Sequence, residues 1–408
     1  MTKNIKGGVC AAKGFKANGL DAGIKNNGKK DMALVYSEAP CKAAGTFTTN
    51  RVKAAPVKWD HKIVHESGSV HAVVVNGGIA NACTGAEGYD CCRMMAQRTG
   101  GGLGIPETSV LVASTGVIGK QLPMDKIGSG IDALCKGLEA DEAHALLAAE
   151  AIMTTDTKSK QAAVRIDLDG TEVTIGGMCK GSGMIHPNMC TMLCFITTDC
   201  AIGRELLQKA LSGGIEDTFN MISVDGDTST NDTVLLLANG LAGNKEITDE
   251  DENYRKFCEA LCYVCAELAK MIAGDGEGCT CLFEARVINA LTKEDAKKLA
   301  KSVVTSSLTK AAVYGRDANW GRIMCAMGYS GAEFEPEKVD IYFESAVGRL
   351  KIVENGMAAD YSEEAASAVL GAEHVIAVCD CKQGGFDASA YGCDLTHEYV
   401  NINADYRS

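Results

Sequence analysis

The stretch KGSGMIHPNMCTMLCFITTDC, residues 180–200, places a threonine, Thr191, between a loop rich in glycine and an apolar run. A threonine hydroxyl is a weak nucleophile unless a base lies beside it. A chain that cuts itself before a threonine supplies that base as the new α-amine. Self-cleavage needs a strained peptide and oxyanion donors, which the preceding loop and the "STG" at 114–116 could supply. From the pattern alone, Thr191 could instead be a helix N-cap or a hydroxyl at the edge of a strand.

Glycine and small polar residues also gather in seven loops that follow apolar runs. Any single loop of this kind can be explained by backbone conformation, because turns favour Gly, Asn and Asp. Seven together favour a binding site, because binding residues gather on loops held by a rigid scaffold. None has the spacing of a phosphate or dinucleotide loop, so nucleotide binding is not expected. The loops are NGGIANACTG (76–85), ASTGVIGK (113–120), MTTDTKSK (153–160), KGSGM (180–184), SVDGDTSTND (223–232), GDGEGCT (274–280) and YGRDANWGR (314–322).

The chain has 19 cysteines, and three of them have a spacing used for iron–sulfur clusters. Cys258, Cys262 and Cys265 form C-x3-C-x2-C, but they are also i, i+4 and i+7 on a helix, with Leu261 and Leu268 widening that face. The spacing therefore predicts the core side of an amphipathic helix. We expect most cysteines to be buried, reduced hydrophobic residues. Two further close pairs lack a zinc partner at useful spacing, Cys279/Cys281 and Cys379/Cys381.

Composition limits the class of protein. The 408 residues are enough for two to three domains, and 46% hydrophobic and 23% charged residues are typical of a soluble globular protein. A net charge of −13 without a long basic run argues against nucleic-acid binding. No apolar run reaches the roughly 20 residues that span a membrane, and the N-terminal residues do not resemble a signal peptide. We expect a cytoplasmic protein.

Strand-like and helix-like segments alternate along the chain and must position these loops. This alternation predicts a mixed α/β (α+β) protein with mixed sheets and a boundary near residue 282. A hairpin is expected over 162–177, turning at Asp169-Gly170. Other expected strands are 32–36, 45–50, 71–76, 109–114, 191–198, 232–240, 283–289, 338–345, 348–355 and 374–380, and expected helices lie within 88–100, 125–153, 203–222, 251–273, 293–307 and 362–371.

Taken together, the motifs closely resemble the ornithine acetyltransferase family (glutamate N-acetyltransferase, the ArgJ type) of arginine biosynthesis. The resemblance runs from near the N-terminus to the final NINADYRS, with seven motifs in the family's order. They are NGGIANACTG, STGVIG, AIMTTDT, KGSGMIHPNMCTML, SVDGDTSTND, DGEG and YGRDANWGRI.

The resemblance implies an architecture and a processing step. The fold would be a layered mixed-sheet sandwich of the ArgJ/DmpA type, with a catalytic domain at 1–282 and a smaller α/β domain at 283–408. The chain would cut itself between Cys190 and Thr191 into an α chain, 1–190, and a β chain, 191–408. Two copies of each would form an α2β2 heterotetramer.

The resemblance also implies a reaction and its residues. The enzyme would transfer an acetyl group from N2-acetyl-L-ornithine to L-glutamate by a ping-pong route, with no metal or organic cofactor. Whether acetyl-CoA also serves as donor is left open. Thr191 would be the nucleophile, its α-amine the base, and Thr115 and Gly116 the oxyanion hole. The implied substrate-binding positions are Thr154, Lys180, Thr191, Glu277, Asn403 and Ser408.

These positions make chemical sense for that substrate. Glu277 can pair with the cationic side chain of acetylornithine, and Lys180 can attract its carboxylate as a point charge. Asn403 and Ser408 stand among the last residues of the chain, so we expect this end to be held across the site.

The sequence departs from the family's usual pattern at three places. Cys190 stands where alanine is usual, and its similar size is expected to permit cleavage. His186 stands where a small residue is common, and we interpret it as packing within its loop. NGGIAN, residues 76–81, replaces the more usual NSGNAN.

Two other functions remain open from the residues alone. One is a self-processed aminopeptidase or amidase of the related fold, which would pass the acyl group to water. The other is an uncleaved binding module without catalytic activity.

Overall fold

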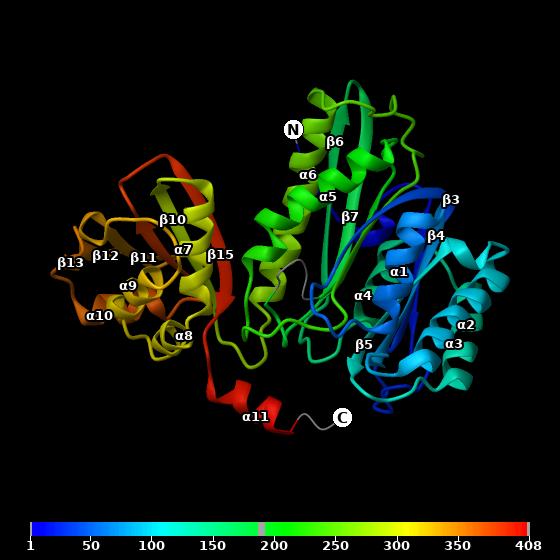
Figure 1. The fold of residues 1–408 in the computed structure, drawn as a ribbon, viewed down its shortest axis with the longest axis horizontal. Coiled ribbons are helices and arrows are strands. Elements are labelled where there is room, and N and C mark those ends of the chain that lie inside the picture. The colour runs from blue at the N-terminus through cyan, green and yellow to red at the C-terminus, as the bar shows by residue number, and fades with distance from the viewer. Residues whose placement is uncertain (1, 187–191, 406–408) are drawn as a thin grey trace.

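The computed structural model describes residues 2–186 and 192–405, which form a larger and a smaller lobe (Figure 1). The helices are α1 Ala55–Glu66, α2 Gly85–Leu103, α3 Met124–Lys136, α4 Glu142–Ala151, α5 Arg204–Asp217, α6 Glu252–Ala273, α7 Lys293–Thr305, α8 Ser307–Tyr314, α9 Trp320–Gly328, α10 Glu363–Leu370 and α11 His397–Asp405. The strands are β1 Lys3–Ile5, β2 Phe15–Leu20, β3 Met32–Phe47, β4 Val70–Ile79, β5 Val110–Val117, β6 Lys160–Leu168, β7 Thr171–Lys180, β8 Leu193–Thr198, β9 Thr233–Ala238, β10 Leu282–Ala290, β11 Asp340–Ser345, β12 Gly348–Glu354, β13 Met357–Ala358, β14 His374–Asp380 and β15 Phe386–Cys393.

The larger lobe is built on a mixed sheet of nine strands in the described part of the chain. Its order is β1-β6-β7-β8-β9-β3-β4-β5, with β2 also pairing with β3. The β8/β9 and β4/β5 pairs are parallel and the others antiparallel. Helices α5 and α6 pack together against β3, β6 and β7, whereas α1 to α4 pack around β2, β3 and β5. The predicted mixed α/β class with mixed sheets is confirmed.

Strand β3 joins the two halves of this sheet. Its first half pairs with β2 and β4, and its second half pairs with β9. The register with β4 shifts between Tyr36 and Cys41, around Pro40, which has no N–H to donate to a ladder. The two strands predicted at 32–36 and 45–50 are therefore parts of one bent strand.

The smaller lobe has its own six-stranded sheet and its own core. The strand order is β13-β12-β11-β14-β10-β15; in this sheet, as the structure describes it, β10 and β14 pair in parallel and the other neighbours are antiparallel. Helix α7 packs on β10 and β15, and α10 packs on β11 and β12. A separate buried cluster fills this lobe, while two large clusters and a small one of four residues lie in the larger lobe within the described ranges. Helix α11 then leaves the smaller lobe toward the larger one (Figure 1).

Local sequence signals explain several of these elements. The β6/β7 hairpin turns at Asp169 and Gly170 with φ of 52° and 86°, so the predicted turn is confirmed. The side chain of Asp251 caps the N-terminus of α6. The three spaced cysteines do lie on this helix; Cys265 is fully buried, and Cys258 and Cys262 are half-buried.

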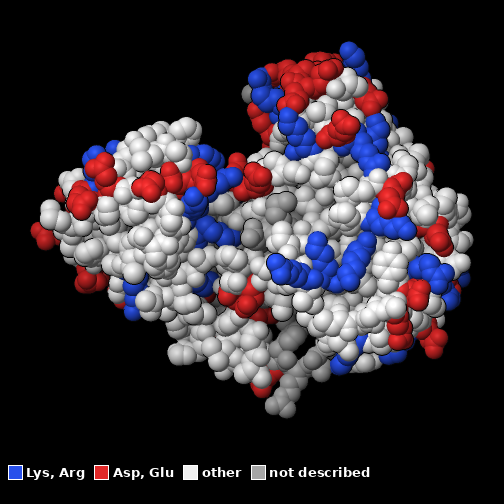
Figure 2. Space-filling model, in the orientation of Figure 1, with Lys and Arg blue, Asp and Glu red and all other residues white. Residues whose placement is uncertain are grey.

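Charge is unevenly distributed over the surface. Figure 2 shows acidic side chains gathered over one end of β6 and α6, and basic side chains in the middle of the same face. In the part of the chain that the structure describes, no helix is long and apolar enough to cross a bilayer.

Candidate active site

Six of the residues singled out from the sequence line one cavity of about 290 Å³. They come from segments far apart in the chain: the end of β5, the loop after α4, the end of β7, the loop after α6 and helix α11. Of the seven predicted loops, five contribute to this cavity, whereas residues 76–85 and 314–322 do not line it. The six residues are Thr115, Gly116, Thr154, Lys180, Glu277 and Asn403.

Thr115 and Gly116 lie where β5 ends beside β4. In the parallel register, Gly116 faces Gly78, next to a register shift. Gly116 has φ of 126°, and a Cβ there would meet the carbonyl carbon of Gly78 at 2.3 Å. Only glycine fits this close approach of two backbones. The amide of Asn231 donates to the carbonyl oxygens of Ala80 and Ser114, which ties the adjoining loops together.

The cavity holds one buried cation and one buried anion. Lys180 and Glu277 are each 8% exposed. Among the described residues, neither has an ion-pair partner within 4.0 Å; the Lys180 ammonium lies 3.4 Å from the Thr115 hydroxyl. Burying a charge without a partner is costly, so both charges suit a ligand that carries the opposite ones.

Two neighbours adjust the position of Glu277. The amide of Asn403 donates to its carboxylate at 2.8 Å, so helix α11 reaches the site, as the sequence predicted for this end of the chain. The backbone N–H of Glu277 donates to the carbonyl oxygen of Ser182 at 2.9 Å. A Cβ at Gly183 would meet the Glu277 carboxyl atoms at 2.3–2.4 Å. Glycine at 183 therefore leaves the space that the carboxylate occupies.

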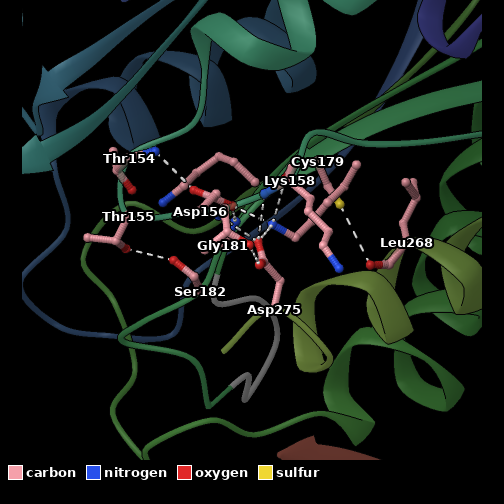
Figure 3. A network of polar contacts seen from close by, with 12 residues as sticks. Thr154, Thr155, Asp156, Lys158, Cys179, Gly181, Ser182, Leu268 and Asp275 are labelled. Carbon is pink, nitrogen blue, oxygen red and sulfur yellow. Dashed lines mark hydrogen bonds and ion pairs between the residues drawn. The ribbon is translucent and has the colours of Figure 1, made fainter. Parts of the chain in front are cut away.

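A fully buried ion cluster supports the loops around the cavity (Figure 3). The Lys160 ammonium lies 2.7 Å from Asp156 and 2.5 Å from Asp275. Asp156 also accepts hydrogen bonds from the N–H groups of Thr154 and Gly181. Burial by itself would raise the pKa of Asp156, but Lys180 and Lys160 lower it to about 2. The cluster thus joins the loops that carry Thr154, Lys180 and Glu277.

A second carboxylate, Asp225, holds the loop that follows β7. It accepts hydrogen bonds from the N–H groups of Met184 and Ile185 at 2.6 and 2.8 Å. His186 is half-buried beside it, with its imidazole 3.1 Å from the Ser223 hydroxyl. Burial, together with the charge of Lys301, lowers the pKa of His186 to about 4. The Thr228 hydroxyl donates to the His186 carbonyl, so both contacts join His186 to the 223–232 loop.

A small cavity of about 30 Å³ adjoins the first one through Thr115, Lys180, Gly183, Met184 and Ser229. Met192 and Asp232 line it too, so the start of the segment leading into β8 lies next to the site. Burial raises the pKa of Asp232 well above its ordinary value, and no described group hydrogen-bonds to its Oδ2. The predicted nucleophile Thr191, its neighbour Cys190 and Ser408 lie outside the described residues.

Sequence reasoning missed the residues that support the site. Asp156, Lys160, Asp275 and Asp225 stand inside loops that the sequence did single out, but their charges gave no sign of which would be buried. As for metal ions, the described ranges contain no group of three or more His, Cys, Asp or Glu side chains arranged to hold one.

The fold and the cavity define a mixed α/β protein with a small site that carries both charges. The sequence pattern of the ArgJ family matches residues 16–408. The arginine biosynthesis bifunctional protein ArgJ 1 of Clostridium acetobutylicum is 53% identical over 97% of this chain and 96% of its own length. The arginine biosynthesis bifunctional protein ArgJ of Thermotoga neapolitana is 50% identical over 97% of this chain and 99% of its own length. The chain belongs to the ArgJ family, and it is an acyltransferase.

Solved structures give shorter matches. The arginine biosynthesis bifunctional protein ArgJ of Bacillus halodurans is 45% identical, with a TM-score of 0.49, over 52% of this chain and 97% of that one. An ornithine acetyltransferase of Mycobacterium tuberculosis, solved in complex with ornithine, is 40% identical with a TM-score of 0.44. The match covers 46% of this chain and 99% of that one.

Proposed function

We propose that this chain transfers the acetyl group of N2-acetyl-L-ornithine to L-glutamate in arginine biosynthesis. The observation that carries the proposal is that Lys180 and Glu277 are both buried in one small cavity and have no ion-pair partner within residues 2–186 and 192–405. Acetylornithine has a carboxylate at one end and an ammonium at the other, so it complements both. The arginine biosynthesis proteins at 50% identity or more support the same assignment.

The proposed reaction begins with self-cleavage between Cys190 and Thr191, which frees the α-amine of Thr191. That amine takes the hydroxyl proton while Oγ attacks the acetyl carbonyl, and Thr115 and Gly116 stabilise the oxyanion. The amide C–N bond then breaks, and the ornithine nitrogen leaves with the proton. Glutamate attacks the acetyl-threonine ester and regenerates the hydroxyl, which makes the route ping-pong. The nucleophile, the base and the oxyanion donors all come from the chain, so the proposed route needs no cofactor.

Further parts of the proposal concern binding and assembly. Thr154, Asn403 and Ser408 would complete the substrate site together with Lys180, Thr191 and Glu277. Residues 1–282 would form the catalytic domain and 283–408 the second domain. The α chain 1–190 and β chain 191–408 would assemble as an α2β2 heterotetramer in the cytoplasm.

Two measurements test the processing and the reaction. Intact mass should give two species that end and begin at 190/191, and Thr191→Ala should give one uncut, inactive chain. Parallel lines in double-reciprocal plots should accompany acetyl transfer to glutamate. A Thr191→Ala chain that still cuts at 190/191 would refute the nucleophile. Release of acetate without acetylglutamate would instead indicate the amidase alternative.

A further inference from the structure

Two cysteines meet at the loop that carries Glu277. Cys279 lies in that loop, between α6 and β10, and Cys393 is the last residue of β15. The Cys279 thiol donates a hydrogen bond to the Cys393 sulfur. A Cβ at Gly276 would meet the Cys393 sulfur at 2.5 Å, so this sulfur also packs against the backbone next to Glu277. The cysteine pair is therefore in direct contact with a loop of the candidate active site.

A buried lysine stands beside Cys393. The Lys310 ammonium lies 3.6 Å from the Cys393 sulfur, and Lys310 is 3% exposed. In the parts of the chain that the structure describes, no carboxylate lies within the 4.0 Å of an ion pair from this ammonium. A buried ammonium needs an anion, and the Cys393 thiolate is in position to supply it.

Cys393 differs in this respect from a cysteine buried among apolar side chains, such as Cys379. Burial raises the pKa of Cys379. The hydrogen bond from Cys279 and the charge of Lys310 instead lower the pKa of Cys393, and the same hydrogen bond raises that of Cys279. The two sulfurs thus share one proton, with the negative charge on Cys393. Thiol reactivity also requires access, which the half-buried Cys279 provides.

The backbones around the two cysteines are held side by side. Asp394, next to Cys393, accepts hydrogen bonds from the N–H and the hydroxyl of Thr280 at 2.8 and 2.6 Å. Cys393 also stands opposite Leu282 in the antiparallel register of β10 and β15. Cysteines on distant backbone segments cannot be bridged without backbone movement, and these contacts bring the two segments together before any oxidation.

We infer that Cys279 and Cys393 form a reversible disulfide by reaction with a low-molecular-weight disulfide, and that this bond lowers activity on acetylornithine by moving Glu277. The effect on activity rests on the proposed function, because it assigns Glu277 to substrate binding. The disulfide itself does not rest on that function, because its formation is measured without substrate.

The exchange proceeds in two steps. The Cys279 proton passes to Cys393 along their hydrogen bond, and the Cys279 thiolate attacks one sulfur of the reagent RSSR, which expels RS⁻. RS⁻ takes the proton from Cys393, whose thiolate then attacks the Cys279 sulfur and expels the second RS⁻. In sum, one thiol, one thiolate and RSSR give the protein disulfide, RSH and RS⁻. Two electrons pass from the protein to the reagent, and dithiothreitol reverses the reaction.

The bond would act on Glu277 through the backbone. A sulfur–sulfur bond of about 2.0 Å is shorter than a hydrogen-bonded contact between two sulfurs, so this end of the loop must move toward β15. Thr280 is already anchored, and the movement therefore falls on residues 276–279. Glycines flank Glu277 on both sides, and Gly278 has φ of 70°. Displacement of this segment takes the Glu277 carboxylate away from the substrate ammonium.

Disulfide formation is measured first. The enzyme is treated with bis(2-hydroxyethyl) disulfide, its free thiols are alkylated, and mass spectrometry of the digest should find a peptide pair that joins Cys279 to Cys393. Dithiothreitol and Cys279→Ser should each abolish this pair. The matched control is Cys325→Ser, which removes an exposed cysteine on α9 and should leave the pair unchanged. No such pair in the wild type, or a link through Cys281 instead, would overturn the site.

Activity then tests the effect on Glu277. After oxidation, kcat/KM for acetylornithine should fall about tenfold, because a charge-assisted contact with the substrate is lost, and dithiothreitol should restore it. Cys279→Ser should match the reduced wild type before and after treatment, whereas Cys325→Ser should respond as the wild type does. A disulfide that leaves kcat/KM unchanged overturns the effect on Glu277 and leaves the proposed function standing. A disulfide that forms in an enzyme inactive on acetylornithine supports the modification site and refutes the proposed function.

Discussion

Two sets of buried charges lie side by side in this protein and differ in how they are neutralised. In the Asp156–Lys160–Asp275 cluster, each charge has a partner within 2.7 Å. In the nearby cavity, Lys180 and Glu277 are nearly as buried and have no ion-pair partner among the described residues. The same residue types thus serve two purposes: the paired set fixes the loops, and the unpaired set is available to a ligand.

The difference between the two sets predicts opposite responses to mutation. Removing one member of a paired set leaves an uncompensated buried charge and destabilises the fold. Removing a member of the unpaired set breaks no ion pair among the described residues, so most of the stability is kept while substrate binding is lost. Stability and activity should therefore separate cleanly between Lys160 and Lys180.

The largest effect is expected for Lys160→Met, which leaves two carboxylates facing each other. The free energy of unfolding should fall by about 3–5 kcal/mol, measured by urea denaturation. The matched control is Lys298→Met, since Lys298 pairs with Glu294 at the same i,i+4 spacing but on the surface. That variant should lose less than about 0.5 kcal/mol. Equal losses would show that burial of the cluster does not matter.

Lys180→Met should lower activity far more than stability, in contrast to Lys160→Met. The kcat/KM for acetylornithine should fall about 100-fold, because a hydrogen bond to a charged group contributes roughly 1.5–3 kcal/mol. The free energy of unfolding should fall much less than in Lys160→Met, because Lys180 stabilises the Asp156 carboxylate without an ion pair to it among the described residues. Lys158→Met is the control and should keep its activity, because Lys158 is an exposed residue of the 153–160 loop and does not itself line the cavity. A large loss of stability in Lys180→Met would assign this lysine to the structural set.

The sequence predicted the unpaired charges better than the paired ones. Lys180 and Glu277 stand in motifs that resemble a known family, so their roles could be carried over residue by residue. Lys158 and Lys160 look alike in the sequence, yet Lys158 is exposed and Lys160 is 1% exposed. The difference arises only when residue 160 begins β6 and Asp275 arrives from another loop, which no local pattern encodes.

The fold shows the same division between local and tertiary signals. Valine-rich runs such as 73–75 predicted strands, and Asp169-Gly170 predicted its turn. The single bent strand β3 was missed because Pro40 looks like a break when only the local sequence is considered. Residues 314–322 were predicted as a loop of the site. They instead join α8 to α9 in the smaller lobe and do not line the cavity.

The paired set should also give a pH signature. Lys180 and Lys160 lower the pKa of Asp156 to about 2 against the effect of burial, so its ionised form stabilises the folded state. This contribution is fully present above the unfolded pKa of about 4 and is lost as pH falls toward about 2. The stability difference between wild type and Asp156→Asn should therefore shrink by about 2 kcal/mol over that range, measured by urea denaturation at each pH. A constant difference would mean that Asp156 acts through hydrogen bonds alone.

The smallest effect is expected at Asn403, which links the C-terminal helix to the unpaired set. Asn403→Ala removes the hydrogen bond to the Glu277 carboxylate, so kcat/KM should fall about fivefold, corresponding to about 1 kcal/mol. Asn401→Ala is the matched control, because Asn401 lies on the same helix and its amide donates to the exposed Glu398. It should change kcat/KM by less than about twofold. If both variants lose activity equally, the helix acts through its general stability, and Glu277 does not depend on Asn403 for its position.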